Sequence, residues 1–157
     1  MTASEAWLLE CGSSLALAVG DHEMAEYVQQ QDFYPIPGAP EYCHGVIVWQ
    51  GNIVPVMDLA TLHDRNTSSG QDRSYLCVLN YQSAPNTALQ HLALRVSRTP
   101  QKIIVDDQHA CELPEYLGGS VLEKVCLACF NRDELPVIII DLARLCSAEI
   151  RDLANAA

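Results

Sequence analysis

At 157 residues, the chain is long enough for one domain or for two small lobes that share a core. Hydrophobic residues make up 49% of it, which excludes the low-hydrophobicity profile of a disordered chain. The 20 acidic and 9 basic residues give a formal charge of −11, so phosphate backbones and anionic membrane surfaces would repel the protein. We therefore expect neither nucleic acid nor a membrane surface as a direct partner.

The apolar runs near the N-terminus are too short to span a bilayer, and Glu5 and Glu10 argue against a signal peptide. The seven cysteines are an odd number at irregular spacings, which is typical of reduced thiols rather than of a secreted disulfide framework. Composition and cysteine usage together predict a cytoplasmic protein.

The first part of the chain predicts two short strands, at residues 7–10 and 15–19, around a turn that contains Gly12. Residues 24–28 (MAEYV) fit either a helical turn or an extended segment, because periodicity cannot decide over so few residues.

The central stretch, residues 34–59, predicts a β-hairpin with a rigid entrance. Three prolines among residues 35–40 fix the backbone and exclude a helix there. Two apolar runs, residues 46–49 and 53–57, flank Gln50-Gly51-Asn52, and Gly and Asn tolerate the positive φ that tight hairpin turns need.

Beyond the hairpin, residues 58–62 predict a short helical turn capped by Asp58. Residues 65–73 are the most polar and turn-rich stretch, and we interpret them as a flexible loop between two halves of the chain. A helix over residues 141–153 is predicted at the C-terminus. Five more strands are expected between these segments, at residues 74–80, 89–96, 101–105, 125–130 and 135–140.

An internal similarity supports two related lobes. Residues 54–62 resemble residues 135–145, because each is an apolar strand with an early proline followed by Asp-Leu-Ala-x-Leu. A strand proline is tolerated at an edge or a bulge. Many short strands separated by turns favour barrels or sandwiches over a parallel sheet.

Several residue pairs suggest chemistry, but each has a plainer structural interpretation. Cys126 and Cys129 form a single C-x-x-C, and in a strand residues three apart point to opposite faces, so buried thiols are expected rather than a metal or redox site. Cys43 and His44 could suggest a nucleophile and a base, but adjacent residues of an extended segment diverge.

Asp58 and Asp141 could form a carboxylate pair, but their shared sequence context predicts two helix caps, one per lobe. Trp49 fits a core position and an exposed binding position equally well. Glu26, between apolar Met24 and Val28, fits a solvated site or the charged rim of an interface.

The central stretch resembles the signature of CheW-like domains. The similarity rests on residues 36–42 (IPGAPEY), Gly45-Val46-Ile47, Gly51 and residues 53–59 (IVPVMDL), and a weaker similarity extends from residue 7 to residue 145. This family includes the chemotaxis coupling protein CheW and the regulatory domain of the kinase CheA. Because nearly the whole chain is covered, the sequence resembles a stand-alone adaptor in one domain, residues 1–157.

The resemblance implies a mainly β fold: two five-stranded, SH3-like β-barrel lobes around a shared core, with a short C-terminal helix. It implies a non-catalytic adaptor, without cofactor or metal, that couples the cytoplasmic tips of chemoreceptors to a CheA-type histidine kinase in chemotaxis or pilus-motility signalling.

The resemblance also implies partner-contacting segments. The segment matching residues 24–28 and Gly45 belong to such surfaces, and the segment matching residues 94–101 contributes to a groove for the receptor tip. A bulky residue at Gly45 is expected to weaken the complex and leave the fold intact. The partner-binding residues expected in this chain are Met24, Glu26, Val28, Gly45, Gln50, Val96 and Gln101.

One position departs from the family. The family usually carries Arg immediately before the turn glycine, where this chain has Gln50, which keeps hydrogen bonding and loses the fixed charge and planar fork. Two alternatives to the standard adaptor therefore stay open: a divergent regulator that binds the kinase only, and a small cysteine-dependent or carboxylate enzyme that would need a reactive Cys43 or Asp58.

Overall fold

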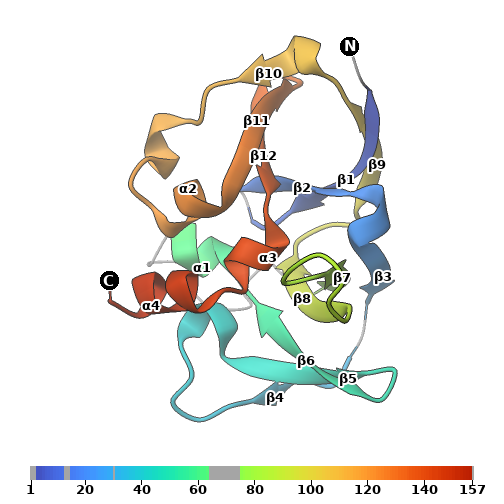
Figure 1. Ribbon diagram of the computed structural model, residues 1–157, viewed down its shortest axis with the longest axis vertical. Helices are drawn as coiled ribbons and strands as arrows, with labels where there is room; N and C mark the ends of the chain where they lie inside the picture. The colour runs from blue at the N-terminus through green and yellow to red at the C-terminus, as the bar shows by residue number, and fades with distance from the viewer. Residues whose placement is uncertain (1–2, 13–14, 30, 64–74, 157) are drawn as a thin grey trace.

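The protein folds into two curled β-sheets, one above the other (Figure 1). This computed structural model describes residues 3–12, 15–29, 31–63 and 75–156. Sheet A, the upper sheet, has the strand order β10-β11-β12-β2-β1-β9, and sheet B has the order β3-β7-β8-β6-β5-β4. The strands of sheet A are β1 (Ser4–Glu10), β2 (Ala16–Gly20), β9 (Gln101–Val105), β10 (Ala110–Cys111), β11 (Cys126–Arg132) and β12 (Leu135–Ile140). Those of sheet B are β3 (Met24–Val28), β4 (Tyr34–Pro35), β5 (Gly45–Trp49), β6 (Asn52–Met57), β7 (Tyr75–Tyr81) and β8 (Gln90–Val96).

The predicted mainly β, two-lobe fold is confirmed. Within the described residues, each sheet has five strands of at least five residues, as expected, and a sixth strand of only two residues at one edge, β10 or β4. The ambiguous segment Met24–Val28 is a strand, because it pairs antiparallel with β7 along sheet B. Tertiary pairing decides a conformation that five residues could not decide alone.

The two sheets exchange strands. The first two strands belong to sheet A, β3 to β8 build sheet B, and β9 to β12 return to sheet A. Within the part of the chain described, the sheets are therefore connected by the segments between β2 and β3 and between β8 and β9. The predicted loop at residues 65–73 lies outside the described residues. The elements on either side of it, β6 with its following helix and β7, belong to sheet B, so this stretch joins two sequence halves and not the two sheets.

The internal similarity has a structural counterpart. Each of the two similar strands makes the parallel pairing of its sheet, β6 with β8 and β12 with β2, and each is followed by Asp and a short helix. Asp141 is a cap as predicted, because its Oδ1 accepts the backbone N–H of Arg144 at 3.1 Å. Asp58 precedes α1 (Leu59–His63), and its backbone carbonyl accepts the N–H and hydroxyl of Thr61 at 3.1 and 2.7 Å. A side-chain cap by Asp58 stays a prediction.

The prediction of one continuous C-terminal helix over residues 141–153 is wrong, because the structure has two helices there. They are α3 (Leu142–Leu145) and α4 (Ala148–Ala156), and a further short helix, α2 (Val121–Val125), precedes β11. Ser147 separates the two: its N–H closes the end of α3, and its Oγ accepts the N–H of Ile150 at 3.4 Å. Serine favours this position because its side chain bonds to the free amides of a helix start.

Both long hairpins close with two-residue turns. Gln50 and Gly51 have φ of 47° and 78°, and Asp133 and Glu134 have φ of 50° and 67°. Positive φ at both central residues is the mark of the type I′ turn, whose twist matches that of the flanking strands. Gln50 therefore presents its exposed side chain at the tip of β5–β6. Of the two turn positions with positive φ, only the second, Gly51, has a glycine, the residue that adopts positive φ without steric cost.

Three apolar clusters form the interior of the part of the chain that the structure describes. One lies within each sheet, and the largest, which we call the shared core, takes side chains from both sheets and from the helices. Strand β8 shows how this is achieved, because Leu92, Leu94 and Val96 enter the shared core and Ala93 enters the cluster within sheet B. Alternate residues of a strand point to opposite faces, so a strand buried on both faces joins two cores.

Candidate interaction surface

Strand β3 is an edge strand of sheet B, and Glu26 is its exposed side chain. The Nε1–H of Trp49 donates to Glu26 Oε1 at 3.3 Å, and the Trp49 ring meets the His91 ring edge-on at 5.0 Å. Gln31 Nε2 donates to the Val48 carbonyl at 3.0 Å. These side chains connect β3 to the end of the β5–β6 hairpin. In the strand order of sheet B, β3 and β5 are separated by three other strands.

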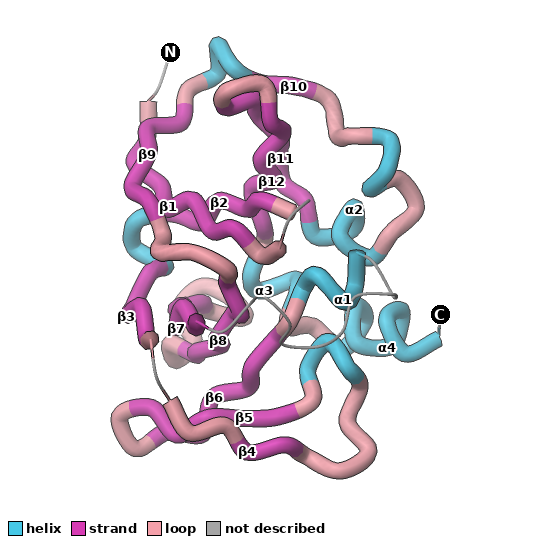
Figure 2. Tube along the Cα trace, turned by 180° about the vertical axis from the view of Figure 1, so that it is seen from behind, coloured by secondary structure: helices cyan, strands magenta, loops and turns pink. Residues whose placement is uncertain are grey.

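On its other side, β3 contacts the connection between the two sheets. The Thr99 hydroxyl donates to the Tyr27 hydroxyl at 3.5 Å, and the N–H and Oγ of Ser97 donate to the Glu10 carbonyl at 2.8 and 3.1 Å. Figure 1 places β3 between sheet A above and the tip of β5–β6 below, and Figure 2 shows the same arrangement from behind. We call this region the β3 surface: Glu26, Tyr27, Trp49, Gln50 and Thr99.

The structure divides the expected partner-binding residues into two groups. Glu26, Gln50 and Gln101 are exposed, and Met24 is half-buried. Val28 and Val96 are buried, because their side chains are 8% and 0% exposed and belong to the apolar clusters, so partner contact through them stays a prediction. Both valines occupy inward positions of their strands.

Gly45 is buried and has a structural task. A Cβ at this position would lie 2.2 Å from Phe33 Cζ and 2.7 Å from the Tyr34 carbonyl oxygen. The Phe33 ring also contacts the His44 ring at a tilt of 59°, with 5.0 Å between the ring centroids, and lies 4.7 Å from the Arg95 guanidinium carbon. The expectation that a bulky residue at Gly45 leaves the fold intact is therefore wrong, because this glycine makes room for Phe33.

Cys43 and His44 lie in different surroundings. Cys43 packs against the shared core, and burial raises the pKa of its thiol. His44 packs against Phe33, and its Nδ1 donates to the Glu41 carbonyl at 3.2 Å. A raised pKa lowers the thiolate fraction at neutral pH, which is the opposite of what nucleophilic catalysis needs.

The other candidates for chemistry are separated as well. Cys126 opens β11, where its thiol donates to the Ala128 carbonyl at 3.2 Å, and Cys129 is buried and faces Cys111 on β10. Among the described residues, no group of three or more His, Cys, Asp and Glu side chains is arranged to hold a metal ion.

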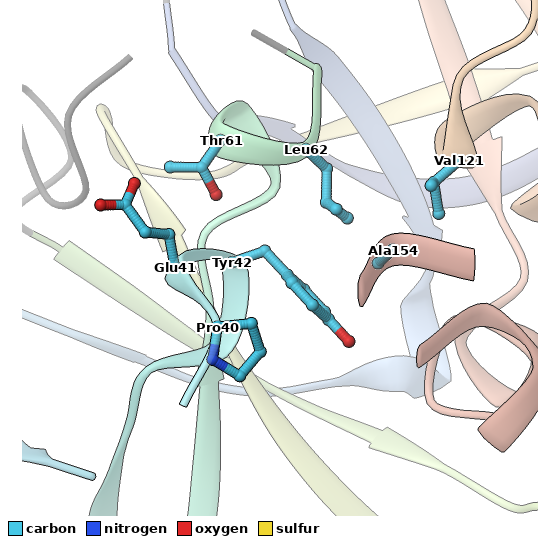
Figure 3. Close-up of a pocket in the computed structure, with 7 residues that line it drawn as sticks. All are labelled: Pro40, Glu41, Tyr42, Thr61, Leu62, Val121 and Ala154. Atoms are coloured by element: carbon cyan, nitrogen blue, oxygen red, sulfur yellow. The ribbon is translucent and has the colours of Figure 1, made fainter. Parts of the chain in front are cut away.

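A pocket of about 250 Å³ lies between the segment of residues 40–42 and the helices α1, α2 and α4 (Figure 3). The Tyr42 ring extends toward Ala154, whereas the Glu41 side chain points in the opposite direction. Burial raises the pKa of Tyr42. Because its polar groups do not converge on one point, the pocket offers no arrangement for acid–base work. Its lining consists of Pro40, Glu41, Tyr42, Thr61, Leu62, Val121 and Ala154.

Comparison with protein families matches the CheW-like domain over residues 5–149. The chain belongs to the CheW-like domain family. Among 14 matching chains of solved structures is the scaffolding protein TtCheW from Thermoanaerobacter tengcongensis, which has 19% sequence identity and a TM-score of 0.67. The match covers 90% of this chain and 86% of that chain. Comparison with curated proteins gave no match.

At this identity, the similarity to TtCheW supports the CheW-like fold and leaves the roles of individual residues to the geometry described above. No helix in the described ranges is long and apolar enough to cross a membrane. Sequence reasoning missed the contacts of Glu26 with Trp49 and of Tyr27 with Thr99, because their partners lie 23 and 72 residues away.

Substitution of Gly45 by Ala is expected to destabilise the fold. The added methyl group collides with Phe33, and such overpacking lowers the free energy of unfolding by about 1–3 kcal/mol. Urea unfolding followed by circular dichroism measures this change. Gly118→Ala is the matched control, because its Cβ would meet its nearest neighbour at 3.2 Å, and its effect should be clearly smaller. Equal stabilities of Gly45→Ala and the unmodified protein would contradict the structural role.

The thiol of Cys43 is expected to react slowly with iodoacetamide. Burial raises its pKa, so less thiolate is present at pH 7.5 in the folded protein than in the unfolded chain. Alkylation followed by mass spectrometry should show slower labelling of Cys43 in buffer than in guanidinium chloride. Cys77, which is 0% exposed and has a pKa raised to about 12, should be slower still. Rapid, selective labelling of Cys43 would contradict this prediction and support the alternative that the protein is a cysteine-dependent enzyme.

Proposed function

We propose that this protein is a non-catalytic adaptor that couples chemoreceptor tips to a CheA-type histidine kinase in the cytoplasm. Membership of the CheW-like family supports this function. TtCheW, which shares the fold, is described as a scaffolding protein. The observation that carries the proposal is the β3 surface, where the edge strand β3, the β5–β6 turn and the segment before β9 meet.

The β3 surface has the chemistry of a recognition site. Tyr27 and Trp49 pack against the apolar clusters and stay half-buried, so each leaves part of its ring accessible, and Glu26 supplies an exposed carboxylate whose Oε1 accepts the Trp49 Nε1–H. Aromatic residues are enriched in interfaces, and charged residues at their edge select the partner and its orientation. A kinase surface that presents a cation opposite Glu26 would fit this arrangement.

Gln50 is the place where this adaptor would differ from most of its family. The residue stands at the tip of β5–β6 with φ of 47°, and its exposed side chain is uncharged. An arginine there would offer a fixed charge and a planar fork for a carboxylate, whereas glutamine offers hydrogen bonds only. We propose that receptor contact at this turn is weaker or directed to a less acidic partner than in relatives with arginine.

The adaptor would act only by holding its two partners in a fixed position relative to each other. Both sheets contribute to the shared core, so a receptor bound on one side and a kinase bound at β3 would be held in a fixed relation. A change in receptor state then changes the position or conformation of the kinase without any reaction in the adaptor.

Charge reversal of Glu26 is expected to release the kinase. Tagged full-length protein and its Glu26→Lys variant are expressed in the source cell, and co-purifying proteins are quantified by mass spectrometry. The unmodified protein should recover a CheA-type kinase and a chemoreceptor, and Glu26→Lys should recover about tenfold less kinase, because a like-charge contact costs at least about 1.4 kcal/mol.

Two variants separate charge from other effects. Glu26→Gln removes the charge and keeps an acceptor for Trp49, so intermediate recovery is expected. Glu134→Lys changes the net charge equally on an exposed turn of sheet A and should behave as the unmodified protein. Kinase without receptor would favour the kinase-only regulator, and recovery of neither, where a known coupling protein from the same cell succeeds, would contradict the adaptor.

A further inference from the structure

Two thiols meet across the edge of sheet A. Cys111 on β10 and Cys129 on β11 are direct partners in the antiparallel register, and their Sγ atoms are 3.0 Å apart. The side chains of directly opposite residues in an antiparallel pair lie on the same face of the sheet, with Cβ atoms close enough for a disulfide. Bond formation needs the two sulfur atoms to approach by only about 1 Å, to the length of an S–S bond.

The two thiols differ in access. Cys129 is 6% exposed, and burial raises the pKa of its thiol to about 12, with the nearby Cys111 thiol contributing. Cys111 is half-buried on a two-residue edge strand, so a small molecule reaches it first. A solvent-accessible thiol beside a second, resolving thiol is an arrangement found in redox-sensing cysteines.

We propose that Cys111 and Cys129 are a redox modification site that a peroxide converts to a disulfide. The Cys111 thiolate attacks one peroxide oxygen, the O–O bond breaks, and Cys111 becomes a sulfenic acid with release of hydroxide. The Cys129 sulfur then attacks the Cys111 sulfur, the S–O bond breaks, and a second hydroxide leaves. With the two thiol protons, hydrogen peroxide is reduced to two waters and the two thiols are oxidised to one disulfide.

The disulfide would secure a weakly held edge. Strand β10 is paired with β11 at two positions, Ala110 with Phe130 and Cys111 with Cys129. The new bond closes the loop between them, which contains α2 (Val121–Val125). A cross-link between the two ends of this loop restricts the unfolded chain and so stabilises the fold. This site is independent of the adaptor function, because it lies in sheet A and the β3 surface is built around an edge strand of sheet B.

Cys126 is the nearest competitor, and its geometry sets it apart. It lies on the same strand as Cys129, and its thiol donates to the Ala128 carbonyl at 3.2 Å. A bulge between Cys126 and Ala128 shifts the register there, and β10 pairs with β11 beyond this bulge.

The test is oxidation of the full-length reduced protein with one equivalent of hydrogen peroxide. Free thiols are blocked, and the disulfide is mapped by peptide mass spectrometry without reduction. We expect a Cys111–Cys129 linkage that dithiothreitol reverses, the loss of two free thiols per chain, and a higher melting temperature in the oxidised protein.

Matched serine variants decide the assignment. Cys111→Ser should abolish both the linkage and the rise in melting temperature, and Cys43→Ser and Cys126→Ser should leave both unchanged. Because the serine variants are compared with their own reduced forms, a small change in basal stability does not affect the result. A main linkage through Cys126 or any other cysteine, or no disulfide while all seven thiols stay reactive after unfolding, would overturn the proposal.

Discussion

Burial of strands on both faces is the constraint on which the molecule depends. In β8, Leu92 and Leu94 enter the shared core while Ala93 enters the interior of sheet B, and in β2 Leu17 enters the shared core while Ala18 enters the interior of sheet A. Each sheet alone would expose its shared face to water, and exposing apolar surface costs a free energy of about 25 cal/mol for each Å². These two strands thus place leucine on the shared face and alanine on the inner face. We therefore expect the two sheets to fold and unfold together as one unit.

The exchange of strands between the sheets places the candidate surface. Because the chain leaves sheet A after β2, strand β3 becomes the edge of sheet B beside the connection that returns to β9. Glu26 faces the β5–β6 turn and Tyr27 faces Thr99, so neighbouring residues of one strand contact two distant segments. A recognition surface of this kind is a property of the packed pair of sheets and of neither sheet alone. The same topology leaves β10 as a short edge strand on sheet A, with Cys111 against Cys129.

Local sequence signals predicted the hairpins and the two-lobe β fold, because turn residues such as Gly51 and alternating apolar runs act within a few positions. They did not decide the conformation of Met24–Val28, since its pairing partner β7 lies about fifty residues away in the sequence. The resemblance could not show that Val28 and Val96 are buried, because it identifies segments, whereas burial alternates residue by residue within them. Gly45 was assigned to a partner and proved to accommodate Phe33, a contact that no spacing in the sequence reveals.

The two tryptophans offer the most direct test, because Trp7 lies in sheet A and Trp49 in sheet B. Trp7→Phe and Trp49→Phe leave one tryptophan each, so fluorescence during urea unfolding follows one sheet at a time, and far-ultraviolet circular dichroism follows the whole molecule. If the shared core makes the sheets one unit, fluorescence and circular dichroism should give the same midpoint and slope within each variant. A tryptophan transition separated from that of the whole molecule, in either variant, would show that the sheets unfold independently and that the shared core does not hold the β3 surface together.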